Sequence, residues 1–384
     1  AGKRYQMDDR KPYLWKTNDY GSTWEKIING IRTDDFLHVI REDIKIPGLL
    51  YAGGEHQVWV SYNDGGSWES LSLNLPDTQI SDLIVTEKDL VVGTHGRSIY
   101  ILDDISPIRE MTKIDSNKPH LYKAYSATRR VQNAELKYFL PSTPDNLSIK
   151  IIDSEGRIVL VKEGTAEKDP EEAGPSWFGV DNKKPSMIEG LNTYTWNLRY
   201  PGASEFEGMI IWSAKPSLGP IAPPGIYDVQ LTVNNIIYKT SIEVKKDPRI
   251  EIADEVIQEQ FEFAMEIMNQ TDIANKSIIE IRAIKERLET NKNSLRNLKK
   301  INTLIGDLEK IESSIYQVKN QSGQDPLNFP IKVNNRLAYL RKSVESGDGL
   351  PTLGSLEVFD LLKEELSGYV SELNKLKSKT NEYF

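Results

Sequence analysis

Pairs of adjacent aspartates are the residues of this 384-residue chain whose types and spacing first suggest chemistry. The pairs are Asp8-Asp9, Asp34-Asp35 and Asp103-Asp104. Hydrolysis of a glycosidic bond needs two carboxyl groups that face each other across a sugar, about 5 or about 6.5–9.5 Å apart according to mechanism. Because adjacent residues of a strand point to opposite faces, such a pair cannot flank one bond. We therefore interpret the pairs as turn and strand-end residues, where Asp is favoured.

Histidine and cysteine supply no catalytic or metal-binding pattern. The four histidines, His38, His56, His95 and His120, are scattered and show no metal-ligand spacing. Cysteine is absent, which excludes disulfides, thiolate nucleophiles and zinc–cysteine sites. The net charge of −9 suggests no basic face for nucleic acid. We predict no catalytic residue, no metal, no cofactor and, because no apolar run approaches about 18 residues, no membrane span.

Two copies of one short pattern organise the first part of the chain. Residues 17–24 and 61–68 both read S/T-x-D/N-x-G-x-S/T-W, and equivalent positions are 44 residues apart, the period of a four-stranded propeller blade. The Asp or Asn side chain accepts hydrogen bonds from nearby backbone N–H groups, and the Gly supplies a positive φ. The pattern therefore predicts two hairpin turns, each with a Trp that packs into its blade. The residues with this structural role are Thr17, Asp19, Gly21, Trp24, Ser61, Asn63, Gly65 and Trp68.

This pattern resembles the Asp box, or BNR repeat, of sialidases, sortilin-like receptors and two-propeller xyloglucan hydrolases. In these families the box lies on the outer edge of a blade, away from the ligand face, so the resemblance implies fold more than function. Residues 91–104, 196–202, 219–225 and 320–330 look like the final propeller strands and C-terminal segments of large exported bacterial proteins labelled sortilin-like or glycosyl hydrolase-like. The resemblance implies an extracytoplasmic location: periplasmic, outer-surface or secreted.

Composition and periodicity divide the chain into three predicted domains, a multidomain β plus α architecture. Residues 1–112 are expected to be the closing blades of an Asp-box β-propeller, because they hold about two blades whereas a propeller closes with about four to eight. The earlier blades are expected to be missing from this sequence. Residues 118–247 alternate like the strands of an immunoglobulin-like β-sandwich. Residues 250–384 repeat apolar residues at helical spacing and are predicted to form an antiparallel four-helix bundle.

Individual elements follow from the same patterns. Alternating apolar runs predict strands at 80–85, 90–94, 134–140, 147–152, 224–233 and 236–244. Asn234-Asn235 suits a primed hairpin turn between the last two strands. One helix is predicted from the stripe Ile301, Leu304, Leu308, Ile311, Ile315 and Val318, which is typical of a bundle seam.

Aromatic residues concentrate in the predicted sandwich, at Trp177, Trp196, Tyr200 and Trp212. A carbohydrate-binding platform would stack sugars on such rings, and Trp177 and Trp212 are the candidates for ligand binding. The alternative, which we favour, is that the rings pack the sandwich or its contacts, since buried aromatics dominate cores and interfaces.

The leading functional hypothesis is a non-catalytic C-terminal scaffold or binding portion of an exported Asp-box propeller protein. Its expected partners are the missing blades of the same protein and, beyond them, carbohydrate or peptide. The alternative is a supporting region of a glycoside hydrolase that acts on polysaccharide and carries its catalytic acids on the missing blades. The resemblance to sortilin-like proteins adds a third hypothesis, a peptide-binding propeller.

Overall fold

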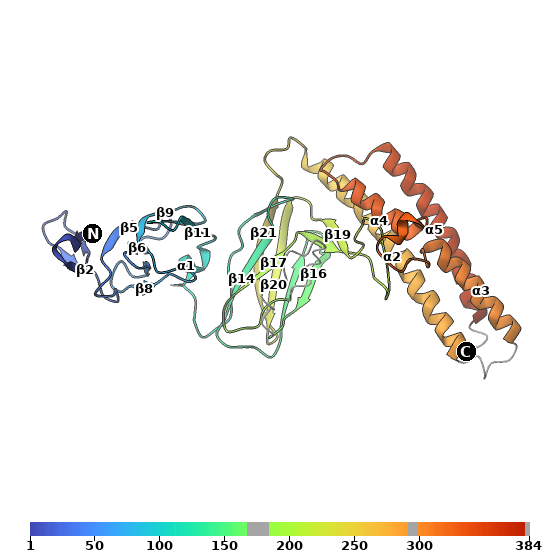
Figure 1. The fold of residues 1–384 in the computed structure, drawn as a ribbon, viewed down its shortest axis with the longest axis horizontal. Coiled ribbons are helices and arrows are strands. Elements are labelled where there is room, and N and C mark those ends of the chain that lie inside the picture. Colours follow the sequence, from blue (N-terminus) through green and yellow to red (C-terminus); the bar gives the residue numbers. More distant parts are fainter. Residues whose placement is uncertain (112, 167–183, 291–297, 381–384) are drawn as a thin grey trace. The chain divides into compact units, whose positions relative to one another are not determined.

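The computed structural model describes residues 1–111, 113–166, 184–290 and 298–380, and Figure 1 shows their order along the chain. The chain forms two compact units. Unit 1 consists of residues 1–123, 137–142 and 189–191, and unit 2 of residues 124–136, 143–188 and 192–384. The protein is therefore a mixed β and α structure, in which several small sheets precede a helical C-terminal region, as predicted at that level. The propeller, the immunoglobulin-like sandwich and the three domain boundaries stay predictions.

Unit 1 is built from short antiparallel strands. They form the pairs β1-β2 and β3-β4, a four-stranded sheet in the order β5-β6-β7-β8, and a three-stranded sheet in the order β11-β10-β9. The strands are β1 (Gly2–Arg4), β2 (Asp9–Tyr13), β3 (Trp15–Lys16), β4 (Glu25–Lys26), β5 (Leu37–Glu42), β6 (Leu50–Gly54), β7 (Val58–Ser61), β8 (Glu69–Ser70), β9 (Ile80–Val85), β10 (Leu90–Thr94), β11 (Ile99–Leu102) and β12 (His120–Leu121), and the helices are η1 (Tyr5–Met7) and α1 (Ser106–Glu110). The strands predicted at 80–85 and 90–94 are confirmed.

The central strands of the β5–β8 sheet, β6 and β7, are buried on both faces. Successive side chains of a strand point to opposite faces, so neighbouring residues belong to different apolar clusters. Tyr51 and Val60 belong to one apolar cluster with Ile80 of β9. Ala52 and Trp59, one residue along, belong to a second cluster that includes residues of the β3–β4 segment. Successive hairpins of the chain therefore pack one on the next, with the β5–β8 sheet in the middle.

Unit 2 contains a five-stranded sheet in the order β13-β21-β20-β15-β16, in which β13 and β21 are parallel and the other pairs antiparallel. The strands are β13 (Ala127–Thr128), β15 (Leu147–Ile152), β16 (Ile158–Glu163), β18 (Arg199–Pro201), β19 (Leu218–Ile221), β20 (Gly225–Val233) and β21 (Ile236–Lys245), while β14 (Ala134–Leu140) and β17 (Gly190–Trp196) have residues in both units. Asn234 and Asn235 have φ values of 46° and 69°, so the predicted primed hairpin turn is confirmed.

Four α-helices form the C-terminal part of unit 2, and their apolar faces share one core. They are α2 (Asp254–Thr290), α3 (Leu298–Ile315), α4 (Val333–Val344) and α5 (Leu353–Thr380), with a short 3₁₀ helix, η2 (Asp325–Leu327), before α4. Figure 1 shows α2, α3 and α5 lying alongside one another. The predicted stripe is buried from Ile301 to Ile315. Its last member was wrong: Val318 lies beyond the end of α3 and is exposed, so it cannot join the seam.

Hydrogen bonds from helix side chains to backbone hold the 202–217 connection between β18 and β19 against the helices. The amide of Asn335 in α4 accepts from Trp212 N at 2.7 Å and donates to Trp212 O at 3.0 Å. Tyr316 Oη accepts from Ile210 N at 3.0 Å. A buried ion pair joins Arg129, after β13, to Asp348, after α4. Sheet and helices of unit 2 are thus held together by polar contacts that cross the predicted boundary at 247–250.

Candidate functional site

The two copies of the S/T-x-D/N-x-G-x-S/T-W pattern, which we call the first and second box, lie in hairpins of identical register. In the first hairpin Trp15 pairs with Lys26 and Lys16 with Glu25, and in the second Trp59 pairs with Ser70 and Val60 with Glu69. Each residue of the second set follows its counterpart by the 44-residue period of the sequence. The sequence repeat is therefore a structural repeat.

The box hydrogen bonds repeat as well. Thr17 Oγ1 donates to Asp19 Oδ1 at 2.9 Å, and that oxygen accepts from Thr23 N at 2.8 Å. In the second box Ser61 Oγ donates to Asn63 Oδ1 at 3.1 Å, and that oxygen accepts from Ser67 N at 2.8 Å. These bonds join residues two to four positions apart, so each box closes its own turn whatever surrounds it.

The glycine of each box also behaves as the pattern predicts. Gly21 and Gly65 have φ values of 95° and 89°, a conformation that favours glycine. Their amides donate to the hydroxyls of Thr17 at 2.8 Å and Ser61 at 2.9 Å. The hydrogen bonds of both turns therefore run between residues of the pattern, while its assignment as an Asp box stays a prediction.

The tryptophans of the two hairpins differ in burial. Trp68 is 3% exposed and Trp59 is 4% exposed, whereas their counterparts Trp24 and Trp15 are 61% and 42% exposed. The prediction that the Trp of each copy is packed was therefore wrong for Trp24, because the first hairpin leaves Trp15 and Trp24 exposed where the second hairpin is covered.

The cover of the second hairpin is the segment that follows the first one. Trp68 Nε1 donates to Ile27 O at 3.0 Å, and Trp68 N donates to Asn29 O at 2.8 Å. The approach is close: a Cβ built on Gly30, whose φ is 95°, would lie 2.2 Å from Trp68 O. By contrast Trp24 Nε1 donates within its own box, to Gly21 O at 3.1 Å. Ile27 O accepts the indole N–H of Trp68 from outside the second box. Among the residues that the structure describes, none outside the first box accepts the indole N–H of Trp24 in this way.

The adjacent aspartates have structural partners. Asp35 is fully buried and its Oδ2 accepts from Trp59 Nε1 at 2.8 Å, while burial raises the pKa of its carboxyl. Asp104 accepts from the Ser106 hydroxyl at 2.6 Å and forms an ion pair with Lys137 at 2.9 Å. Such contacts fix turns and a buried indole.

Three of the histidines contact one carboxylate each. The pairs are His38–Glu55, His56–Asp77 and His120–Glu110, each at 2.9 Å. Within the described ranges, no group of three or more His, Asp or Glu side chains is arranged to hold a metal ion. In the same part of the chain no helix has the length and apolar character that crossing a membrane requires.

The two predicted ligand-binding tryptophans have different outcomes. Trp177 lies outside the described residues. Trp212 is half-buried, and its backbone is held by Asn335. Its neighbours Ile211 and Ser213 line a pocket, so Trp212 lies in a segment that borders a cavity. A role of Trp212 itself in ligand binding stays a prediction.

That pocket, which we call the Arg199 pocket, has a volume of about 460 Å³ and lies in unit 2. It is lined by Arg199 and Leu218 at the start of β18 and β19, by the connection between these strands, and by the last turn of α4. The lining residues are Arg199, Ile211, Ser213, Ala214, Lys215, Leu218, Arg341, Lys342 and Glu345. Sequence reasoning missed this site, because its cationic residues are far apart in the sequence and follow no motif.

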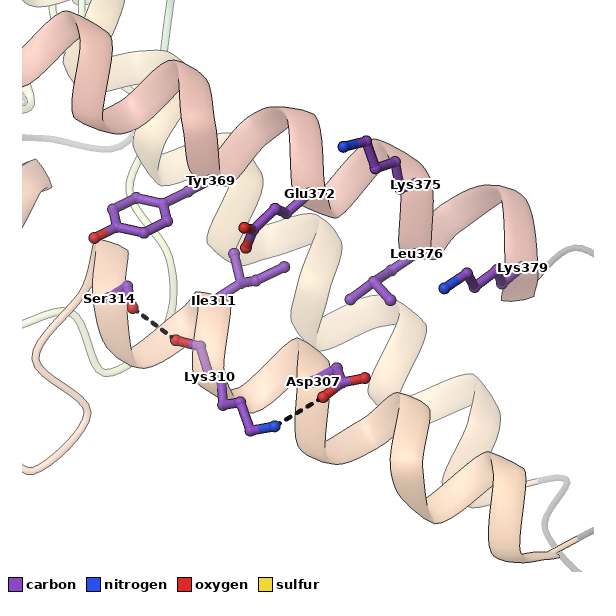
Figure 2. Close-up of a pocket in the computed structure, with 9 residues that line it drawn as sticks. All are labelled: Asp307, Lys310, Ile311, Ser314, Tyr369, Glu372, Lys375, Leu376 and Lys379. Atoms are coloured by element: carbon purple, nitrogen blue, oxygen red, sulfur yellow. Dashed lines mark hydrogen bonds and ion pairs between the residues drawn. The ribbon is translucent and has the colours of Figure 1, made fainter.

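A second pocket of about 280 Å³ lies between α3 and α5. Figure 2 shows Ile311 and Leu376 facing each other across it, with Lys310 turned toward Asp307. Lys310 Nζ and Asp307 Oδ1 are 2.9 Å apart. Two acidic side chains, Asp307 and Glu372, and three basic ones, Lys310, Lys375 and Lys379, line this groove, so both signs of charge are present.

Comparison with protein-family models gives no match, and neither does comparison with curated proteins. Among solved structures, the extracellular domain of a putative hybrid two-component system from B. thetaiotaomicron is similar at 9% identity and a TM-score of 0.22, over 62% of this chain and 29% of that one. The extracellular domain described as a putative one-component system from the same organism gives 9% identity and 0.21, over 60% and 28%. This chain thus spans less than a third of either neighbour. Similarity at this level establishes neither fold nor function, and the Asp-box resemblance stays a prediction.

Proposed function

We propose that this chain is a non-catalytic scaffold or binding portion of an exported Asp-box propeller protein, and that its first hairpin docks against a further hairpin of the same kind. The observation that carries the proposal is the exposure of Trp15 and Trp24, at positions equivalent to the buried Trp59 and Trp68. The bonds accepted by Asp19 Oδ1 and Asn63 Oδ1 and the strand register are the same in the two hairpins, so the cover of the tryptophans is what differs.

The energetic argument supports a docking surface. Complete burial of one large apolar side chain stabilises a protein by about 1.5–3 kcal/mol relative to exposure. Exposed rings of this size, side by side in equivalent positions of a hairpin, are typical of an interaction surface. The occupant that fits is a segment like 27–35, which offers Ile27 O and the Asp35 carboxylate to the two indole N–H groups of the second hairpin.

Residue-resolved hydroxyl-radical footprinting tests the proposal in this chain and in the full-length product of its gene. In this chain Trp24 is expected to oxidise readily and Trp68 slowly. In the full-length protein the oxidation rate of Trp24 should fall toward that of Trp68, which serves as the internal standard. Equal reactivity of Trp24 in both proteins would overturn the proposal.

A polysaccharide-hydrolysis assay of the same two proteins separates the hypotheses about activity. We expect this chain to be inactive, because its described carboxylate pairs serve turns and buried partners. Hydrolysis by the full-length protein alone would assign the chain a supporting role in a glycoside hydrolase. Hydrolysis by this chain would contradict the non-catalytic proposal.

A further inference from the structure

The Arg199 pocket gathers cationic side chains around a single carboxylate. Arg199, Arg341 and Lys342 line it together with Glu345, and Lys215 adds a fourth cationic residue to the wall. Arg341 and Glu345 are buried, so the charges at the base of the pocket are shielded from bulk water. Interactions between charges are stronger in such surroundings than at an open surface.

Both carboxylate oxygens of Glu345 accept hydrogen bonds from the protein. Its Oε1 accepts from Ile221 N at 2.8 Å, and its Oε2 accepts from Arg341 Nη1 at 2.5 Å. Arg199 is the second cation near this carboxylate, with Nη1 at 3.8 Å from Oε2. One carboxylate therefore lies near two guanidinium groups and accepts a hydrogen bond only from that of Arg341.

Arg199 retains donors for a ligand. Its Nη1 donates to Gly219 O at 2.7 Å. Within the described part of the chain, Nε and Nη2 of Arg199 have no protein acceptor. Burial lowers the pKa of Arg199, and the like charges of Arg341 and Arg130 add to this effect, while Glu345 opposes it. Because a guanidinium stays protonated in proteins, the cationic residues of the lining outnumber the single carboxylate, Glu345, and the pocket carries an excess of positive charge.

The rest of the pocket lining is mostly apolar and consists of Ile211, Ala214, Leu218 and Ser213. The hydroxyl of Ser213 accepts a hydrogen bond from Lys342 Nζ at 3.1 Å. The volume of about 460 Å³ lies within the range of about 300–1,000 Å³ that is usual for small-molecule sites. The carbonyl of Val344, at the C-terminal end of α4, accepts a hydrogen bond from Gln260 Nε2 at 2.9 Å. This carbonyl, which belongs to the negative end of the helix, is therefore already paired within the protein.

We propose that the Arg199 pocket binds an organic oxyanion, that is, a carboxylate or phosphate group carried on an apolar body. The oxyanion accepts from Arg199 Nε and Nη2, with Lys342 at the rim, and the apolar body lies against Ile211 and Leu218. A planar guanidinium matches carboxylate and phosphate oxygens in a two-bond geometry.

Isothermal titration of the intact 384-residue chain tests this proposal with benzoate, phenyl phosphate, benzamide and inorganic phosphate. Benzoate or phenyl phosphate is expected to bind saturably in the millimolar range or tighter. Benzamide has the shape of benzoate without its charge, and inorganic phosphate has the charge without the apolar body, so both should bind at least about tenfold more weakly. Preference between benzoate and phenyl phosphate identifies the oxyanion. Equal affinity for benzoate and benzamide, or no saturable binding of either anion, would overturn the proposal.

Variants locate the binding site. Arg199→Gln should weaken anion binding by about tenfold or more, since hydrogen bonds to charged groups are the strong ones, and Arg199→Lys should restore part of it. Lys342→Gln, at an exposed residue, keeps the test valid if Arg199→Gln does not fold, and should weaken binding by about threefold. Lys375→Gln removes the same charge from the α3–α5 groove of Figure 2 and should have no effect. Equal weakening by Lys342→Gln and Lys375→Gln would show a net-charge effect and contradict the assignment.

Discussion

Trp68 Nε1 donates a hydrogen bond to the backbone oxygen of Ile27, 3.0 Å away, and so joins the second box to the segment that follows the first. The contact lies in an apolar cluster that contains both residues. An indole N–H in a buried setting needs such an acceptor, because an unpaired polar group away from water is costly.

The first prediction concerns this contact. Trp68→Ala should lower the free energy of unfolding of unit 1 by about 3–5 kcal/mol, the usual cost of removing a buried tryptophan. Trp24→Ala, at the equivalent but exposed position, is the matched control and should cost less than about 1 kcal/mol. Urea denaturation, followed by hydrogen-exchange protection of the β6 and β7 amides, measures both. Similar losses in the two variants would show that the first hairpin is also covered.

The second prediction concerns pH. The hydrogen bond from the Thr23 hydroxyl, with that from the Thr23 amide, holds the pKa of Asp19 below its usual value. Because the folded-state pKa is lowered, the stabilisation is present above the unfolded pKa of about 3.9 and is lost as the pH falls through the folded pKa. Protection of the Thr23 amide should therefore decrease on acidification.

Asn63 provides the control for that experiment, since it occupies the position of Asp19 in the second box and cannot ionise. The Ser67 amide, which donates to Asn63, should keep its protection over the same pH range. Asn63→Asp should make it sensitive to acid. Hydrogen exchange corrected for the intrinsic pH dependence of the rate measures both amides. If both boxes responded alike before the substitution, the carboxylate of Asp19 would not be the cause.

The third prediction concerns the ion pair between Arg129 and Asp348, both of which are almost completely buried. Asp348→Asn leaves the Arg129 guanidinium buried without its counter-charge, which should cost about 3–5 kcal/mol of stability. Arg130 also contacts Asp348, at 2.6 Å, but is partly exposed. Arg130→Gln should therefore cost about 1 kcal/mol or less. Thermal unfolding followed by circular dichroism at helix wavelengths gives both values, and a small loss in Asp348→Asn would argue against a role for this pair in holding the helices to the sheet.

The fourth prediction links the fold to the Arg199 pocket. Asn335→Ala removes both hydrogen bonds to the backbone of Trp212 and should cost about 1–3 kcal/mol. Because Trp212 lies between the pocket residues Ile211 and Ser213, anion affinity should also fall, although no charge is removed. Asn328→Ala changes an exposed residue of the same type outside the pocket and serves as the control. Unchanged anion affinity in Asn335→Ala would mean that the connection does not shape the binding site.

The sequence by itself determined the features whose hydrogen bonds or apolar contacts are local. Both box turns close through side chains two to four residues from their acceptors, and the Asn234-Asn235 turn depends on the φ values of those two residues. The stripe from Ile301 to Ile315 follows from helical periodicity alone. A pattern of neighbouring residues is sufficient for such elements, because their partners lie within the same short segment.

Only the tertiary structure decided which copy of the repeat is covered and where a ligand site forms. Trp24 and Trp68 occupy the same position of the same pattern, yet the approach of Ile27 buries only Trp68. Arg199 and Arg341 come from distant parts of the chain and meet because Asn335, Glu345 and their neighbours fasten the β18–β19 connection to α4. Burial and the meeting of like charges depend on contacts between distant segments, and no local pattern encodes them.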